Sequence, residues 1–373
     1  MNAIFSPIDR AVDIRTLVRA LLVLAPPFAA ALGTGDPMWM QAALITVSVF
    51  IATEQTGLAP LGVALHGLAV VAGFLILLAA WPFPFAFAVV AAVMAAGAIL
   101  LTAKGHKLRT LGNFTFIPAL YLGIELGEPG SGFVLARGMA FLPYAVLAVL
   151  PVLTLSAMEH GGELEPYIHR VGHFRHLRRR GADHGTAVPC IEAAIAAALA
   201  VVAAALLVEW RNLPHAQWAV WSAASVVTGE VATAKRKLAD RMLGVLVGVP
   251  IGVACALAVP HATVFLRLAE IGIVLTLVAF RVYRVGFGAR CACIAFALTF
   301  AGKWAETADR VANVMAGGSI GLAFVFAAHA VAMAMREHLS IADRDHRPIA
   351  CRFATFRLQV TALRGPKIRK SSR

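Results

Sequence analysis

A basic run in the second half of the chain leads into a row of evenly spaced glycines. Residues 234–241 read AKRKLADR. The glycines follow at intervals of four, as Gly244, Gly248 and Gly252. Glycines at this spacing share one helix face and let another helix approach closely in lipid, so a packing groove is their simplest interpretation. Arg241, paired with Asp240 or Glu230, adds a guanidinium group that can attract a carboxylate substrate.

Other cationic and aromatic side chains can help to bind an organic anion. Trp39 and Trp218 each follow a turn that contains proline, and each begins a short apolar segment rich in Ser, Thr and Ala. We predict that these indoles and the basic run bind the substrate. The candidate substrate-binding residues are Arg241, Lys235, Arg236, Lys237, Trp218 and Trp39.

Several ionisable residues lie within apolar segments, where charge is costly and a functional role is the first explanation. They are Glu54, His66, Glu192, Glu230, Arg267, Glu270 and His329. Most lie near segment ends, where a side chain that reaches the interface is the simpler explanation. Arg267 and Glu270 are three residues apart and can neutralise each other.

Proton coupling is predicted for some of these residues. His66 and His329 lie deepest, and a histidine that titrates near neutral pH can relay protons, although packing is the simpler alternative. The candidate proton-coupling residues are Glu230, Glu54, His66, His329 and Asp240.

Metal and cofactor sites are not expected. His169, His173 and His176 would share one face of a helix, and metal binding is one alternative for them. The neighbouring arginines repel cations and favour anionic lipid headgroups instead. The five cysteines form no CxxC pair and are interpreted as packing residues.

Composition and segment lengths predict an all-α polytopic membrane protein. Of the 373 residues, 60% are hydrophobic and only 14% are charged, which excludes an ordinary soluble domain. About 12 transmembrane helices are expected, at residues 16–33, 38–53, 57–80, 83–103, 110–125, 134–157, 188–208, 216–231, 241–259, 264–281, 286–301 and 311–335. The second and eighth segments are short, and can be tilted, re-entrant or discontinuous.

The distribution of basic residues supports this topology, because basic short loops mark the cytoplasmic side. With a cytoplasmic N-terminus, basic clusters at residues 104–109, 170–180, 235–237 and 281–290 all fall on that side, as does the tail. Six crossings per half predict two parallel six-helix repeats. The net charge of +13 is thereby explained without nucleic acid as a partner.

Four regions follow from this pattern. They are the N-terminal membrane half (1–157), a cytoplasmic basic linker (158–187), the C-terminal membrane half (188–337) and a basic cytoplasmic tail (338–373).

The run from Trp218 through Thr228, Thr233, Lys235–Lys237, Arg241, Gly244 and Gly248 resembles the repeated core of the fusaric acid resistance and aromatic carboxylic acid exporter family. The first half lacks the corresponding Arg-x-x-Gly-x-x-x-Gly pattern, and the linker is far shorter than the cytoplasmic domain of long members. The chain therefore resembles a short branch of inner-membrane members. The resemblance implies duplicated membrane halves, proton-driven efflux of organic acids and a periplasmic membrane-fusion adaptor protein as a partner.

Together these features predict a multi-pass secondary transporter of a bacterial inner membrane, with both termini cytoplasmic. It would export small organic acids or toxic compounds, with proton coupling. A passive anion channel and a scaffold subunit of an envelope efflux assembly are the alternatives. An enzyme is not expected, because no DxxxD-like carboxylate pair lies within the predicted transmembrane segments. The sequence has no GxxxxGK[ST] loop for ATP, so proton coupling is the default. Expected partners are the lipid bilayer, a small organic anion and a second copy of the chain.

Overall fold

The computed structural model describes residues 11–101, 106–127, 134–160, 190–227 and 231–345. All the helices in these ranges are α-helices. Those of the first half are α2 (Ile14–Thr34), α3 (Met38–Thr56), α4 (Pro60–Ala80), α5 (Pro84–Leu100), α6 (His106–Glu125) and α7 (Val134–His160). Those of the second half are α9 (Cys190–Arg211), α10 (Ala216–Val226), α11 (Val231–Ala258), α12 (Thr263–Leu275), α13 (Tyr283–Phe300) and α14 (Trp304–Asp345).

A helix is present at each of the twelve predicted segments, and the prediction of an all-α fold is confirmed. Six described helices are long and apolar enough to cross a bilayer, namely α2, α4, α7, α9, α11 and α14. The chain is a polytopic membrane protein with six candidate spans. Turn residues set the boundaries: Gly35 and Gly57 end α2 and α3 in the left-handed conformation, and Pro60 and Pro84 begin α4 and α5.

Two predicted crossings are shorter in the structure than in the sequence pattern. The segments expected at 216–231 and 264–281 form helices that end at Val226 and Leu275. At 1.5 Å per residue, the eleven residues of α10 extend only about 16 Å, half of the roughly 30 Å hydrocarbon core. After α12, Asp13 donates a backbone hydrogen bond to Ala279 O (2.9 Å), which helps to hold the chain out of helical geometry.

The basic residues expected in loops are another difference. Lys235–Lys237 lie in the first turns of α11, and Arg109 and Arg290 lie within α6 and α13. Lysine and arginine are strong helix formers, so the helices continue through these charges where the apolar pattern stops. The consequence is that the cations have fixed directions, which a loop would not give them.

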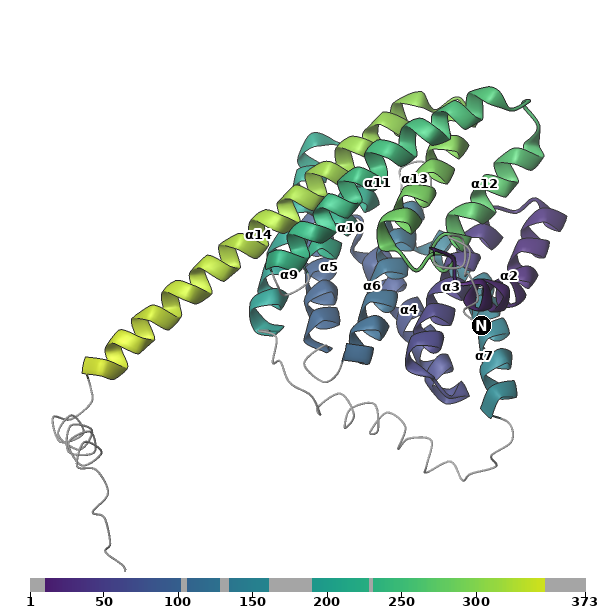
Figure 1. Cartoon of the computed structure of the whole chain (residues 1–373). Helices are drawn as coiled ribbons and strands as arrows, with labels where there is room; N and C mark the ends of the chain where they lie inside the picture. Colours follow the sequence, from purple (N-terminus) through teal and green to yellow (C-terminus); the bar gives the residue numbers. More distant parts are fainter. Residues whose placement is uncertain (1–10, 102–105, 128–133, 161–189, 228–230, 346–373) are drawn as a thin grey trace, which may run out of the picture. The chain divides into compact units, whose positions relative to one another are not determined.

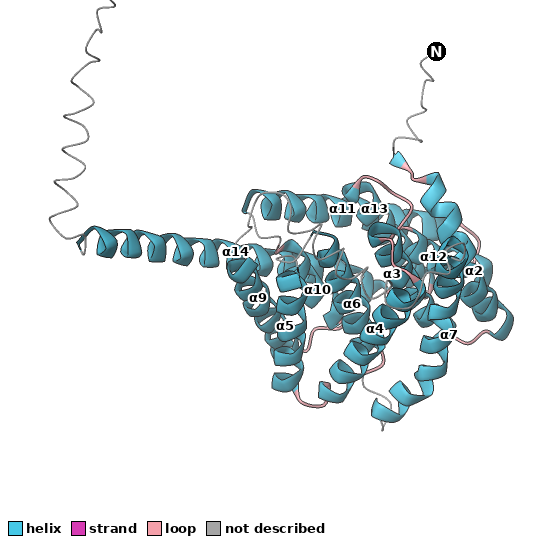
Figure 2. Cartoon of the chain, turned by 90° about the horizontal axis from the view of Figure 1, so that it is seen from below, coloured by secondary structure: helices cyan, strands magenta, loops and turns pink. Residues whose placement is uncertain are grey.

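The second half is organised around a close contact between α11 and α13, which lie side by side in both views (Figures 1 and 2). A Cβ added at Gly248 would meet the backbone carbonyl of Gly288, and one at Gly252 would meet that of Ala292. Gly244 faces Phe287 and Gly288 in the same way. The three glycines thus form one face of α11, against which α13 packs at backbone distance.

The two halves meet where α5 packs along α9, and again where α12 contacts α2 and α3. Residues 11–13 also pair with residues 279–281: Val12 and Phe280 form an antiparallel bridge, and Arg281 donates from its backbone to Ala11 O at 3.0 Å. The start of the first half is therefore tied to the loop before α13.

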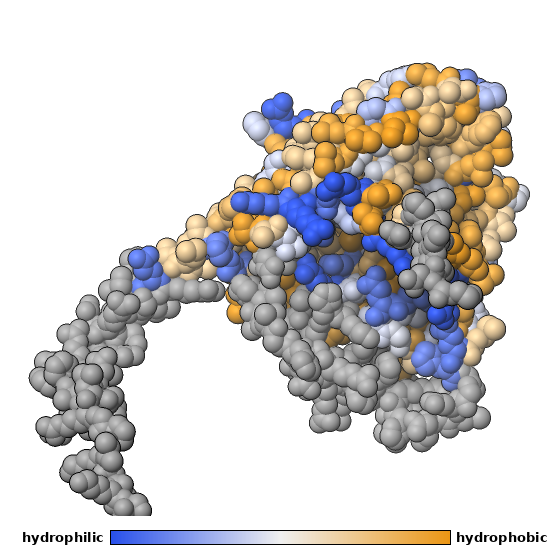
Figure 3. Space-filling view, viewed as in Figure 1, coloured by the Kyte–Doolittle hydropathy of each residue, from blue (hydrophilic) through white to orange (hydrophobic). Residues whose placement is uncertain are grey.

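Large apolar side chains cover much of the outer surface. Leu22, Leu68, Val93 and Phe85 are all more than 60% exposed, and each lies on a strongly apolar helix. The face seen in Figure 3 is hydrophobic over much of its upper and right-hand part, and hydrophilic residues lie across its middle. Apolar exposure on this scale is incompatible with water and fits a lipid surround.

Two compact units make up the chain, Met1–Ala327 and Ala328–Arg373. All contacts discussed below lie in the first unit. The predicted linker falls largely on residues 161–189, and most of the predicted tail on residues 346–373, so both lie outside the described residues.

Candidate anion-binding site

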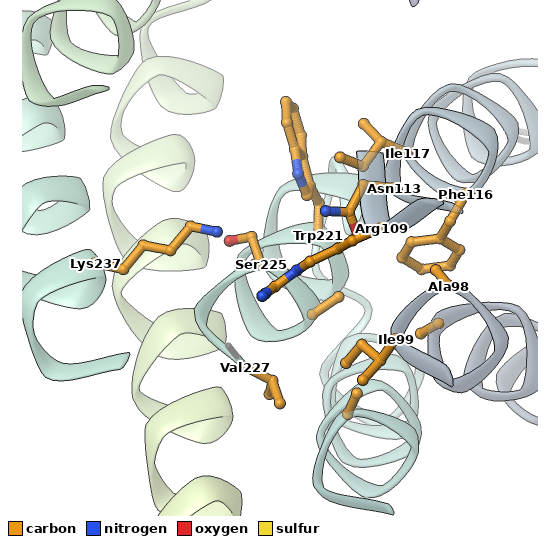
Figure 4. A pocket seen from close by; sticks show the side chains of 13 residues that line it. Ala98, Ile99, Arg109, Asn113, Phe116, Ile117, Trp221, Ser225, Val227 and Lys237 are labelled. Carbon is orange, nitrogen blue, oxygen red and sulfur yellow. The ribbon is translucent and has the colours of Figure 1, made fainter. Parts of the chain in front are cut away.

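A pocket lies between helices of both halves, lined by residues of α5, α6, α9, α10 and α11 and by Val227 (Figure 4). Its cavity volume is small, about 50 Å³. Its polar lining comes from Arg109, Asn113, Ser225 and Lys237. The apolar lining includes Trp221 and Phe116 together with small and aliphatic side chains.

Two cations from different halves face this pocket. In Figure 4 the ammonium group of Lys237 points toward the hydroxyl of Ser225, and the guanidinium group of Arg109 points into the same space. The positive charges of Arg109 and Arg241 both act on Lys237. Like charges brought together in a partly buried pocket repel each other unless an anion lies between them.

Helical periodicity explains why these side chains converge. Arg109, Asn113 and Phe116 are four and three residues apart on α6, and therefore share one face. On α10, Trp221 and Ser225 are four residues apart. The pocket forms where these two faces meet, because α6 contacts α10.

Arg241 lies behind one wall of the pocket. It is four residues beyond Lys237 on α11 and only 2% exposed. Its Nε donates to Ser222 Oγ at 3.2 Å and its Nη1 donates to Tyr283 Oη at 3.0 Å. The guanidinium carbon lies 5.8 Å from the centre of the Trp221 ring, so this indole separates Arg241 from the pocket that Trp221 lines.

The predicted partners of Arg241 were not found. Asp240 pairs instead with Arg284, whose Nε donates to Asp240 Oδ1 at 2.8 Å. Consecutive residues lie on different faces of a helix, so the Asp240 side chain cannot lie beside the buried Arg241 guanidinium. Glu230 lies outside the described residues.

The remaining predicted substrate-binding residues are spread over several places. The Lys235 ammonium lies 4.9 Å from the Phe326 ring centre, and Arg236 is exposed. Trp218 is buried, and the Arg310 guanidinium carbon lies 4.8 Å from its ring. The sixth predicted residue, Trp39, packs edge-on against Tyr144 in the first half at 5.0 Å. Of the six residues, only Lys237 lines the pocket and only Arg241 lies directly behind it.

Among the predicted proton-coupling residues, Glu54 has the most informative surroundings. Arg19 donates to Glu54 Oε1 through Nε at 2.9 Å, and its Nη2 lies 2.5 Å from Glu159 Oε1. Two carboxylates from α3 and α7 thus share one guanidinium from α2. All three side chains are partly exposed, so protons can reach them.

The two histidines differ in environment. His66 is 6% exposed, and neither ring nitrogen makes a hydrogen bond of ordinary geometry within the described residues, although the Leu111 backbone is nearby. His329 is exposed and lies in the second unit. The predicted ion pair between Arg267 and Glu270 is confirmed, at 2.9 Å.

A carboxylate in the loop between α2 and α3 has a shifted pKa. The hydroxyl of Tyr144 donates to Asp36 Oδ2 at 2.5 Å, and the backbone N–H of Met38 donates to Oδ1 at 2.9 Å. Both hydrogen bonds stabilise the charged form, and they hold the pKa of Asp36 below its ordinary value.

Sequence reasoning missed most of the pocket. Arg109 was expected in a loop, and Trp221, Ser225, Asn113 and Phe116 were not considered. A local signal existed, since the spacing from Arg109 to Phe116 places a cation, an amide and an aromatic ring on one helix face. Metal ligands are a separate matter: the described residues contain no group of three His, Cys, Asp or Glu side chains that could hold a metal ion, and the histidines of the predicted linker lie outside them.

Comparison with protein families gives a match in the second half of the chain. Residues 194–324 match the family model described as fusaric acid resistance protein-like. No curated protein and no solved structure matches the chain. The matched range runs from α9 into α14 and includes Trp221, Ser225, Lys237 and Arg241, whereas the contributions of α5 and α6 to the pocket precede it. Residues 194–324 of this polytopic membrane protein are therefore similar to a fusaric acid resistance protein-like domain.

Proposed function

We propose that the protein is a secondary transporter that exports small aromatic carboxylates across a bacterial inner membrane in exchange for protons. The observation that carries the proposal is the pocket between the halves, where Arg109 and Lys237 face a space lined by Trp221 and Phe116. A carboxylate would lie between the cations and its ring against the aromatic side chains. The match to the fusaric acid resistance protein-like family supports transport over catalysis.

The polar groups of the pocket suit one end of an aromatic carboxylate. Charge-assisted hydrogen bonds to a carboxylate are stronger than neutral ones, and arginine can bind both oxygens at once. Ser225 and Asn113 add hydroxyl and amide donors. The rest of the lining is apolar, which matches the usual division of a small-molecule site into a few polar contacts and an apolar body.

The transporter we propose has twelve crossings arranged as two parallel repeats. The six long apolar helices occupy the first, third and sixth positions of each half. Equivalent helices also make equivalent contacts: α2 with α3 and α9 with α10, α4 with α6 and α11 with α13, α5 with α6 and α12 with α13.

Side-chain contacts repeat in the same way. In the first half Thr46 donates to Ala148 O at 2.8 Å, and in the second half Ser222 donates to Val314 O at 2.7 Å. Four residues before each acceptor, the sixth helix contacts the tryptophan near the start of the second helix. These contacts are Tyr144 with Trp39 and Arg310 with Trp218.

In this arrangement α10 is a discontinuous crossing. It ends next to Val227, whose backbone is extended and which lines the pocket. Non-helical backbone at membrane depth is tolerated where it lines a polar cavity, and a broken helix is a common element of transporter sites.

The proposed orientation places both termini and the basic N-terminal turns of α6 and α11 on the cytoplasmic side. Arg109 and Lys237, which line the pocket, belong to these turns. An exporter would then bind its anion from the cytoplasm. The four regions predicted from the sequence, a periplasmic adaptor protein and self-association of the chain complete the proposal.

For proton coupling we propose the group formed by Arg19, Glu54 and Glu159. One guanidinium cannot fully neutralise two carboxylates, so protonation of either carboxylate changes how α2, α3 and α7 are held together. A proton can thereby bias the packing of the first half, whose helices α5 and α6 line the pocket.

Purified protein in liposomes loaded with benzoate or with acetate tests the proposal. We expect benzoate release to accelerate when a proton gradient is imposed, and to fall back when an ionophore collapses it. Release that ignores the gradient would instead establish a passive channel. No release of either anion from liposomes that contain folded protein would overturn the transport proposal.

A further inference from the structure

Three arginines of the second half lie together, and none of them takes part in an ion pair among the described residues. They are Arg241 on α11, Arg290 on α13 and Arg310 on α14. Arg241 and Arg290 lie 5.8 and 6.0 Å from the same Trp221 ring, and the charges of Arg241 and Arg310 both act on Arg290. The three guanidinium groups therefore form one cluster.

The surroundings of this cluster are largely apolar. The buried core of the second half contains Trp218, Phe287 and Cys291. Arg241 lies 4.4 Å from the Phe287 ring centre, and Arg310 lies 4.8 Å from that of Trp218. Arg241 and Arg310 are each 2% exposed, so water does not screen their charges.

Protein groups satisfy this cluster only in part. Arg310 donates from Nη2 to the weak acceptor Cys291 Sγ at 3.6 Å, and Arg290 donates from Nη2 to Thr276 O at 3.3 Å. The Nε atoms of both arginines are buried and have no hydrogen-bond partner within the described residues. Unsatisfied donors on buried charges are rare in proteins and call for a ligand.

Three acidic residues of the same half have partners outside the cluster. Glu306 bonds to His215 at 2.8 Å, Asp240 to Arg284 at 2.7 Å and Glu270 to Arg267 at 2.9 Å. None of the described ion pairs includes an arginine of the cluster. No described ion pair supplies a counterion to the cluster, so a bound anion would balance part of its charge.

We propose that Arg241, Arg290 and Arg310 form an interior binding site for a small monovalent anion, either a halide or a carboxylate group. The site is distinct from the pocket, and the Trp221 ring lies between the two. If the anion is a carboxylate, the cluster is a second binding position on the transport path. The assignment of the cluster to the transport path rests on the proposed function, whereas halide binding at the cluster does not.

Tryptophan fluorescence measures binding directly, because iodide quenches an indole that it contacts and Trp218 and Trp221 both flank the cluster. The full chain in neutral detergent is titrated with iodide in place of gluconate at constant ionic strength. We expect a saturable component of quenching in the wild type. In Arg310→Gln its half-saturating concentration should rise at least tenfold. Arg267→Gln, which removes a paired arginine on α12, should leave it unchanged.

Thermal unfolding gives a second readout. Chloride in place of gluconate should raise the melting temperature of the wild type but not that of Arg310→Gln. In gluconate, Arg290→Met should be more stable than the wild type, because it removes a buried charge that has no counterion. Should Arg310→Gln fail to fold, Arg290→Gln, at a less buried position, carries the same expectation for both readouts.

Competition identifies the source of the anion. Displacement of iodide by benzoate would show that the cluster accepts carboxylates, and displacement by chloride alone would show a resident inorganic anion. Either result supports the site, whether or not liposomes transport benzoate. Linear quenching that is equal in the wild type and Arg310→Gln, with no melting shift in chloride, would overturn it.

Discussion

The Arg241 guanidinium carbon lies 5.8 Å from the centre of the Trp221 ring, and Trp221 also lines the pocket that Arg109 and Lys237 face. The buried Arg241 thus lies behind the Trp221 ring and does not line the pocket itself. Its hydrogen bonds to Ser222 and Tyr283 fix that position.

Replacing Arg241 with alanine should lower benzoate efflux at least about tenfold, a change equivalent to about 1.4 kcal/mol. Its charge favours an anion in the pocket, and its hydrogen bonds hold α10 against α11 and α13. Arg241→Lys should retain part of the activity, because it keeps the charge but loses the planar fork. Efflux is measured in liposomes with equal amounts of inserted protein.

Arg284→Gln serves as the matched control, since Arg284 is an exposed arginine of α13. It pairs with Asp240, which precedes Arg241 on α11. Arg284→Gln should leave efflux near the wild-type rate. If Arg241→Ala were as active as this control, Arg241 would have no part in transport.

Close packing of α11 on α13 predicts different effects at two glycines. Gly248→Ala should destabilise the protein by about 1–3 kcal/mol, because the new Cβ would collide with the Gly288 carbonyl. Gly97→Ala on α5 meets no atom within 4 Å and should be neutral or stabilising by up to about 1 kcal/mol. Thermal unfolding in detergent compares the two variants. Equal stability of Gly248→Ala and Gly97→Ala would contradict the close packing of α11 on α13.

The Tyr144–Asp36 hydrogen bond predicts a dependence of stability on pH. Because the folded protein holds the pKa of Asp36 below its ordinary value, this carboxylate stabilises the fold above about pH 4, and the contribution is lost as pH falls through the lower folded pKa. Tyr144→Phe should therefore be less stable than the wild type at pH 6. The stability difference between the two proteins should shrink toward pH 3. An equal difference in melting temperature at both pH values would show that the ionisation of Asp36 does not contribute to stability.

Coupling is tested at the carboxylates that share Arg19. Glu54→Gln and Glu159→Gln should each retain benzoate release without a gradient but lose most of the acceleration by a proton gradient. The reason is that a glutamine side chain neither binds nor releases a proton. Glu270→Gln changes a carboxylate that is paired only within α12 and serves as control. Full acceleration in both test variants would move the coupling site elsewhere.

Much of the fold could be predicted from the sequence, because lipid makes hydrophobicity a strong signal. All twelve apolar segments are helical, and most boundaries fall within three residues of the expected ones. The predicted helix boundaries were wrong where a helix contains charged residues. The pattern of apolar residues stops at Lys235–Lys237, but the helix does not, and α14 continues from Trp304 to Asp345.

The site was less predictable, for a physical reason. Lys237 and Arg241 share a helix, so local periodicity relates them, but Arg109 is more than a hundred residues away and reaches the pocket only through packing between the halves. Arg310 likewise meets Cys291 across α13 and α14. Contacts of this kind depend on which helices are neighbours, and one sequence does not reveal that.

The most direct test of the central claim compares transport of benzoate with that of benzamide, a neutral molecule of nearly the same shape, in the wild type and in Lys237→Gln. We predict that the wild type transports benzoate at least about tenfold faster than benzamide, because an anion is bound between Arg109 and Lys237. Lys237→Gln should remove most of this preference. Equal rates for the two molecules in the wild type, or a preference that Lys237→Gln leaves intact, would contradict it.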